Sequence, residues 1–88
     1  MIIRLLAIGE YMSIEISSEE YERFLNYDDG LLYCSMVVID GVDNWRMPSE
    51  DEMIVLGLDI SKYWGIDTDV RFLGDSRLRV RPVRDIYY

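Results

Sequence analysis

The chain alternates between apolar blocks and polar segments, and the apolar blocks predict the strands of a small sheet. Residues 2–8 and 13–16 are apolar-rich segments separated by Gly9, which predicts a first β-hairpin. Residues 31–39 form an apolar run without polar alternation, typical of a central strand covered on both faces. Residues 31–39 are therefore expected at the centre of the sheet.

A first helix is predicted by the polar residues that follow the hairpin. Ser17 and Glu20 have the spacing of a capping box, and Ile16 and Tyr21 occupy the positions of a hydrophobic staple. The segment is expected to end at residues 28–30, an Asp-Asp-Gly sequence. Its buried face would consist of Tyr21, Phe24 and Leu25.

A second helix is predicted by the capping box of Ser49 and Glu52, which precedes an apolar run at residues 53–56. That run would also serve as a strand, and Gly57 interrupts it. The helix is favoured because four large apolar residues share helical spacing: Met53, Leu56, Ile60 and Trp64.

The remaining segments complete an antiparallel sheet. Residues 40–44 predict a turn, and residues 45–47 a short strand stopped by Pro48. Residues 70–73 and 77–83 predict a closing hairpin with a three-residue loop. We therefore expect a single α+β domain spanning residues 1–88: a mostly antiparallel four- or five-stranded sheet with two helices packed on one face.

Charge is distributed unevenly over this fold. The 88 residues include 17 Asp and Glu, 9 Lys and Arg and no His, a net charge of −8. Residues 1–69 carry 15 acidic and 4 basic side chains, a net −11, whereas residues 70–88 carry 2 acidic and 5 basic, a net +3. This composition disfavours direct binding to nucleic acid or to a membrane surface and favours a basic partner.

The acidic side chains lie mainly at predicted helix starts and turns. Each position has a structural explanation, because carboxylates complement the helix macrodipole and Asp stabilises turns. Their total negative charge exceeds what the solubility of a small domain requires. The candidate partner-binding residues are Glu19, Glu20, Glu22, Asp28, Asp29, Asp40, Asp43, Glu50, Asp51 and Glu52.

Four arginines form a second candidate site. A three-residue hairpin loop sets Arg71 opposite Arg79, with Arg77 and Arg81 on the same face. Like charges in this arrangement need a counter-anion. That anion is either an internal acidic segment, such as residues 50–52, or a bound phosphate or carboxylate.

Catalytic and metal-binding chemistry has little support. The chain has no His, the commonest general base and metal ligand. The only cysteine, Cys34, lies in an apolar run, so a packing role is expected and no intrachain disulfide is possible. The Asp pairs at residues 40 and 43 and at residues 67 and 69 do not match the calcium-binding loop. We therefore expect no enzyme activity, no cofactor and no metal.

The terminal Tyr87 and Tyr88 are harder to bury than the other aromatic residues and are candidate interface residues. They support the alternative of a small structural or assembly subunit that self-associates through an edge strand, as a monomer or homodimer.

The favoured function is a small cytoplasmic inhibitor that occupies a basic, nucleic-acid-binding surface of a partner protein and mimics nucleic acid. No signal-peptide core or membrane span is apparent in the sequence. Phage-encoded inhibitors of host defence nucleases are similar to this chain in size and charge, and this analogy suggests an anti-defence role. Immunity or antitoxin-like proteins are a third possibility.

Overall fold

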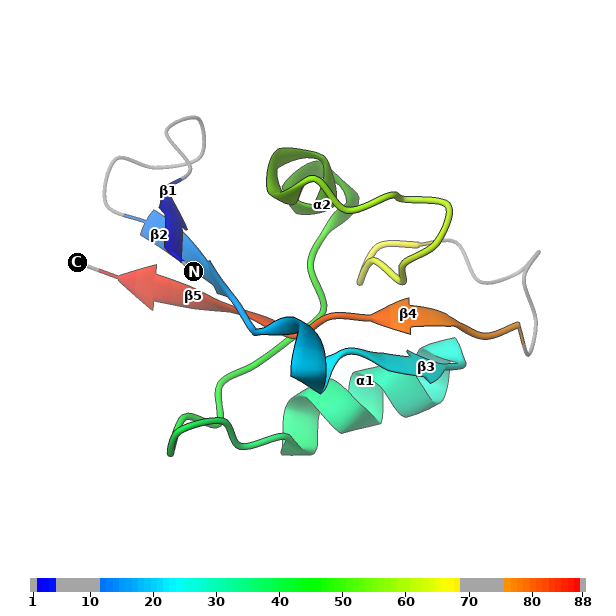
Figure 1. The fold of residues 1–88 in the computed structure, drawn as a ribbon, viewed down its shortest axis with the longest axis horizontal. Helices are drawn as coiled ribbons and strands as arrows, with labels where there is room; N and C mark the ends of the chain where they lie inside the picture. Colours follow the sequence, from blue (N-terminus) through cyan, green and yellow to red (C-terminus); the bar gives the residue numbers. More distant parts are fainter. Residues whose placement is uncertain (1, 5–11, 69–75, 88) are drawn as a thin grey trace.

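The computed structural model describes residues 2–4, 12–68 and 76–87, which form an α+β fold (Figure 1). The predicted α+β class is confirmed. In chain order the elements are β1 (Ile2–Arg4), β2 (Met12–Ile16), the 3₁₀ helix η1 (Glu19–Tyr21), β3 (Arg23–Leu25), α1 (Tyr27–Met36), α2 (Glu50–Leu56), β4 (Leu78–Val80) and β5 (Val83–Tyr87).

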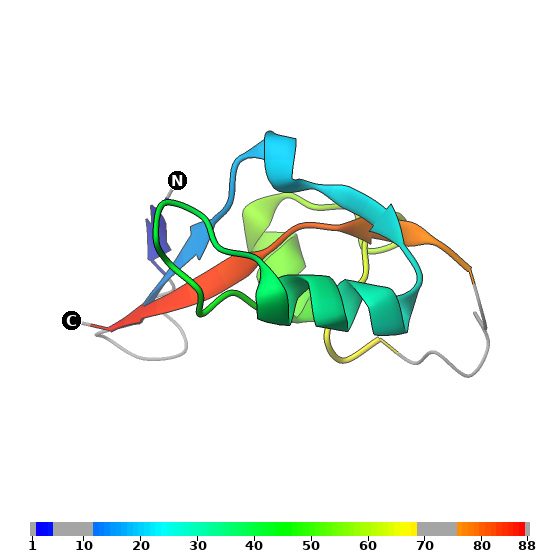
Figure 2. The same cartoon turned by 90° about the horizontal axis from the view of Figure 1, so that it is seen from below.

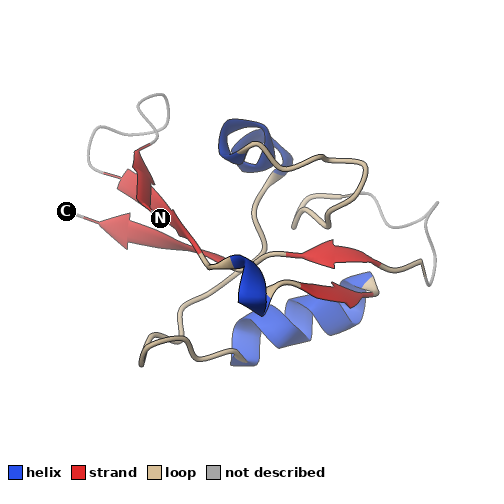
Figure 3. Ribbon diagram, in the orientation of Figure 1, coloured by secondary structure: helices blue, strands red, loops and turns tan. Residues whose placement is uncertain are grey.

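The described strands form two antiparallel sheets rather than the one sheet predicted. One sheet has the order β1-β2-β5, and the other pairs β3 with β4 (Figure 3). The predicted first hairpin pairing is confirmed where it is described, with Ile3 opposite Ile14. Residues 5–11 lie outside the described residues.

The two helices lie on opposite sides of the path from β4 to β5, not on one face of a sheet (Figures 1 and 2). Each helix covers its own small apolar cluster. Leu56, at the end of α2, packs on Ile14, Ile16 and Val83 of the three-stranded sheet. Helix α1 packs at the other cluster, which consists of Cys34, Met47, Trp64 and Val80.

The central strand predicted for residues 31–39 is wrong, because most of this run belongs to α1. The helix begins after Asn26, whose side-chain oxygen accepts a hydrogen bond from the Asp29 amide at 2.8 Å. Asp28 and Asp29 occupy the first turn, where carboxylates complement the macrodipole. The residues predicted to end one helix therefore begin another.

The helix predicted from Ser17 is also wrong. The Ser17 hydroxyl donates to the Pro82 carbonyl at 2.8 Å, and the Ser17 amide bonds to the same oxygen at 3.0 Å. A long-range contact thus replaces the local cap, and only η1 forms before the chain extends into β3. Phe24, predicted to be buried, is 62% exposed.

The second helix begins as predicted, at a complete capping box formed by Ser49 and Glu52. It ends at Leu56, because Gly57 adopts a left-handed conformation with φ of 76°. The predicted helical stripe through Ile60 and Trp64 is therefore wrong. Trp64 lies outside the helix, and the Trp64 amide donates a hydrogen bond to the Arg79 carbonyl at 2.9 Å.

The predicted turn at residues 40–44 is confirmed in a tight form. Ile39 and Val42 bridge each other, and the two residues between them, Asp40 and Gly41, have φ of 51° and 79°. Two successive positive φ values are the signature of a type I′ turn. Residues 45–47, expected as a strand, pair only through a bridge between Arg46 and Val83.

The described part of the predicted closing hairpin pairs with other segments. Its second strand divides at Pro82 into β4 and β5, which join different sheets. Arg79 of β4 has Phe24 as its antiparallel partner and forms a parallel bridge with Tyr63. The first strand of that hairpin, residues 70–73, lies outside the described residues.

Gly30 permits the close approach of α1 to the core. A Cβ atom at this position would lie 2.5 Å from the Met47 methyl carbon and 2.9 Å from a Val80 methyl carbon. Alanine normally stabilises a helix by about 1 kcal/mol relative to glycine. Here we expect Gly30→Ala to lower the free energy of unfolding by about 1–3 kcal/mol, the typical cost of overpacking, measured by urea denaturation. An increase in stability would contradict this packing argument.

Candidate functional site

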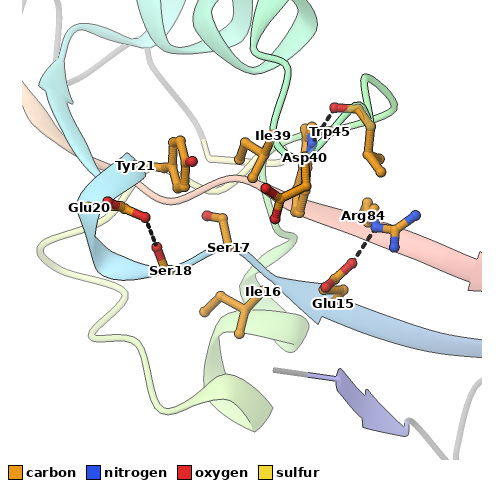
Figure 4. Close-up of a pocket in the computed structure, with 11 residues that line it drawn as sticks. Glu15, Ile16, Ser17, Ser18, Glu20, Tyr21, Ile39, Asp40, Trp45 and Arg84 are labelled. Atoms are coloured by element: carbon orange, nitrogen blue, oxygen red, sulfur yellow. Dashed lines mark hydrogen bonds and ion pairs between the residues drawn. The ribbon is translucent and has the colours of Figure 1, made fainter.

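The candidate site is a pocket of about 340 Å³ between η1, the end of β2 and the turn at residues 39–42 (Figure 4). Its walls combine carboxylates with apolar and aromatic side chains. Its lining includes Glu15, Glu20, Tyr21, Ile39, Asp40, Val42, Trp45 and Arg84.

Two acidic side chains of the pocket have no cation partner among the described residues. The Glu20 carboxylate accepts a hydrogen bond from the Ser18 hydroxyl at 3.1 Å but forms no ion pair. Asp40 is exposed and is the first of the two central residues of the turn. In the view of Figure 4, Asp40 lies between Glu20 on one side and Glu15 on the other. The pocket therefore has two carboxylates that form no ion pair with a described cation.

The other side of the pocket already contains a guanidinium stacked on an indole. Arg84 is 5.7 Å from the centre of the Trp45 ring and forms an ion pair with Glu15. The Trp45 indole N–H donates to the Val42 carbonyl at 2.9 Å, which fixes the ring relative to the turn. This wall thus provides a cation–π surface.

The ten predicted partner-binding carboxylates separate into two groups. Eight are exposed and form no salt bridge to any described residue. These eight, called the exposed acidic set below, are Glu19, Glu20, Asp28, Asp29, Asp40, Asp43, Glu50 and Asp51. The other two, Glu22 and Glu52, are turned inward and paired with arginines. Only Glu20 and Asp40 of the exposed set line the pocket.

Two of the three described arginines of the predicted face, Arg79 and Arg81, are paired with Glu22. Arg79 and Arg81 each place a guanidinium nitrogen 3.5 Å from a Glu22 oxygen. The Tyr63 hydroxyl donates to the same carboxylate at 2.5 Å, and burial together with this acidic partner raises the pKa of Tyr63. The counter-anion is thus Glu22 and not residues 50–52. Arg77 is exposed, and Arg71 lies outside the described residues.

An ion-pair cluster missed at the sequence level joins α2 to β5. The Arg46 guanidinium bonds to both oxygens of Glu52, at 2.7 and 2.8 Å, and to both oxygens of Asp85, at 2.7 and 3.1 Å. It also donates to the Met47 carbonyl at 3.0 Å. The five guanidinium N–H donors of Arg46 therefore match five interactions.

Glu52 shows how this cluster balances burial against hydrogen bonding. Burial by itself raises the pKa of the Glu52 carboxyl, but hydrogen bonds from Arg46 and Ser49 outweigh that effect and lower the pKa. One signal in the sequence pointed to this role. Arg46 is the only basic residue between Arg23 and Lys62, within a long acidic stretch.

Cys34 is buried in the cluster under α1. Burial raises the pKa of the Cys34 thiol to about 12, so the thiolate is scarce at neutral pH. Tyr87 pairs through its backbone with Met12 in the sheet, and Tyr88 lies outside the described residues.

Two further features of the described residues concern metals and membranes. No group of three or more Cys, Asp and Glu side chains is gathered in a way that could hold a metal ion. Over the same part of the chain, no helix has the length and apolar character needed to cross a membrane.

Comparison of the chain with protein-family models, with curated proteins and with solved structures finds no match.

Proposed function

We propose that the protein is a small cytoplasmic inhibitor whose acidic surface occupies a basic, nucleic-acid-binding surface of a partner protein. The observation that supports this proposal is the internal pairing of arginines. Arg46, Arg79, Arg81 and Arg84 pair with carboxylates that are themselves half-buried or buried. The exposed acidic set is left without compensation from them.

This pairing leaves the net charge of −8 unchanged, but it engages four arginines away from the exposed acidic set. Internal ion pairs neutralise basic side chains that would otherwise shield neighbouring carboxylates. A surface built to hold a phosphate backbone gains most of its affinity from Lys and Arg contacts. Exposed carboxylates on a rigid fold compete for the same contacts without any reaction, so the proposed protein is not an enzyme and needs no cofactor.

The test is capture of the partner by the immobilised protein, followed by affinity measurements at low and high salt. We expect binding to weaken steeply with salt, because screening shortens the range of exposed charges. Four carboxylates that do not line the pocket are neutralised with Asp28→Asn, Asp29→Asn, Glu50→Gln and Asp51→Asn. This should weaken binding about tenfold, at a few tenths of a kcal/mol for each charge.

Lys62→Gln is the matched control, because it changes an exposed side chain while making the net charge more negative. Its affinity should equal or exceed that of the unmodified protein. An affinity that is insensitive to salt, or equal for the fourfold variant, contradicts the proposal. If the captured partner is a toxin rather than a nucleic-acid-binding protein, the immunity or antitoxin-like function replaces the one proposed.

A second candidate function, a self-associating structural subunit, is favoured by one observation. Large apolar side chains are exposed on the described surface, including the adjacent Ile54 and Val55 of α2, at 66% and 53%. Exposed apolar patches often mark interaction sites. Light scattering in the same salt series separates the two functions: a monomer supports the inhibitor, and a salt-insensitive oligomer supports the subunit.

A further inference from the structure

We propose that the pocket between η1 and the turn at residues 39–42 receives one arginine side chain of the basic partner. This inference rests on the proposed function and gives it a defined contact point. Other acidic positions would then steer the partner, whereas the pocket would hold a single anchor.

The first argument is the charge of the pocket. Three carboxylates, from Glu15, Glu20 and Asp40, line it together with one guanidinium, that of Arg84, which leaves a net charge of −2. Arg84 is committed to Glu15. Glu20 and Asp40 therefore remain available for an incoming cation, and a guanidinium can bind carboxylates through several donors at once.

The second argument is the chemistry of the walls. The Trp45 ring is buried and already occupied by the Arg84 guanidinium, at 5.7 Å from its centre, which shows that a guanidinium fits against this wall. Tyr21, beside Glu20, adds a second aromatic ring, while Ile39 and Val42 supply apolar surface for the methylene groups of the side chain (Figure 4). Arginine suits this combination better than lysine, because its planar head stacks on aromatic rings.

The third argument is that contacts within the fold define the Asp40 backbone and the Glu20 side chain before a partner arrives. Asp40 lies in a two-residue turn, which the Trp45 indole anchors through the Val42 carbonyl. Glu20 is fixed by the Ser18 hydroxyl. A preformed site loses little conformational entropy on binding, which is the usual property of an anchor pocket.

The experiment uses a capped Gly-Arg-Gly tripeptide as the probe in ¹H–¹⁵N NMR titrations. The same peptide with neutral citrulline or with lysine in place of arginine serves as comparison. We expect shifts of the Trp45 indole N–H and of the residue 39–42 amides with the arginine peptide, weaker shifts with lysine and none with citrulline. Shifts spread over the surface, or equal for citrulline, would overturn the proposal.

Two charge-matched double variants complete the test. Glu20→Gln with Asp40→Asn removes the charges of these two carboxylates and should weaken binding of the arginine peptide at least fivefold. Asparagine also tolerates the positive φ at position 40. Glu50→Gln with Asp51→Asn removes the same charge elsewhere and should change the affinity less than twofold. If both double variants weaken peptide binding equally, only the net charge matters, and the pocket proposal is overturned.

Failure of the pocket is distinguishable from failure of the proposed function. The two double variants are also compared against the captured partner. If both variants weaken binding of the partner equally and the affinity falls with salt, the proposed inhibitor function is supported and the pocket proposal is overturned. If the partner binds independently of salt, the proposed function fails. In that case localised arginine-peptide shifts that are lost only in the pocket variant still support the pocket.

Discussion

Replacing Arg46 with methionine should lower the free energy of unfolding by about 3 kcal/mol, because two carboxylates lose their only described counter-charge. Glu52 and Asp85 both bond to the Arg46 guanidinium, and Glu52 is almost completely buried. Breaking a buried ion pair typically costs about 3–5 kcal/mol. The lower end applies here, since the Arg46 and Asp85 side chains are 28% and 25% exposed and solvent screens the remaining charges.

The measurement is urea denaturation followed by circular dichroism, with a triple variant as the matched control. Adding Glu52→Gln and Asp85→Asn to Arg46→Met removes the uncompensated charges. Glutamine at position 52 keeps an acceptor for the Ser49 amide, so the capping box can persist. We expect the triple variant to recover much of the lost stability. A triple variant no more stable than Arg46→Met would show that the cluster acts through packing rather than charge.

The same variants should differ in the sign of their pH dependence. The folded state lowers the pKa of Glu52 below its ordinary value of 4.5. Its contribution to stability is therefore present above pH 4.5 and is lost as the pH falls through the lowered pKa. Without Arg46, burial is opposed only by the hydrogen bonds with Ser49, and we expect the pKa of Glu52 to rise above 4.5. Arg46→Met should then become more stable as the pH falls from 7 towards 5, opposite to the unmodified protein below pH 4.5.

The two predicted capping boxes show when residue spacing is sufficient to predict a helix start. Ser49 and Glu52 formed the predicted cap, because their partners are each other and lie within one turn. Ser17 had the same local spacing, but its hydroxyl and amide both bond to Pro82, 65 residues away. A capping box read from spacing alone cannot reveal this competing long-range contact.

The strand prediction for the apolar run at residues 31–39 was wrong for a related reason. Buried strands and buried helices both produce uninterrupted apolar runs, and periodicity does not separate them. Asn26 supplied the deciding signal, a cap that accepts from the Asp29 amide, but Gly30 within the following turn suggested a helix end. That glycine is instead required by the contact of α1 with Met47 and Val80.

The candidate site was predictable in its charge but not in its geometry. The sequence proposed Glu20 and Asp40 as candidate partner-binding residues. It did not place them on one pocket, because η1 and the turn at residues 39–42 are adjacent only in the fold. Trp45 and Arg84 were missed as site residues for the same reason, since their contact joins positions 39 residues apart.

The other large effect concerns Trp64, which we expect to contribute about 3–5 kcal/mol to stability relative to alanine. Its side chain is fully buried in the cluster with Cys34, Met47 and Val80. The ring meets Tyr27 edge to face, with centroids 5.5 Å apart. Trp64→Ala removes this packing and leaves a cavity between α1 and the β3–β4 sheet, so the urea midpoint should fall sharply.

Two companion variants make the Trp64 result interpretable. Trp64→Phe keeps an aromatic ring but removes the indole N–H, which donates to the Leu25 carbonyl at 2.7 Å. Leaving that acceptor without its donor should cost about 1–3 kcal/mol, so the phenylalanine variant should fall between alanine and the unmodified protein. Phe24→Ala is the control, because Phe24 is largely exposed and its truncation should change stability by about 0.5 kcal/mol or less. If truncating Trp64 cost no more than truncating Phe24, the cluster under α1 would not be the core of this fold. The larger loss at Trp64 is expected because its ring joins segments that the sequence separates widely, from Tyr27 to Val80.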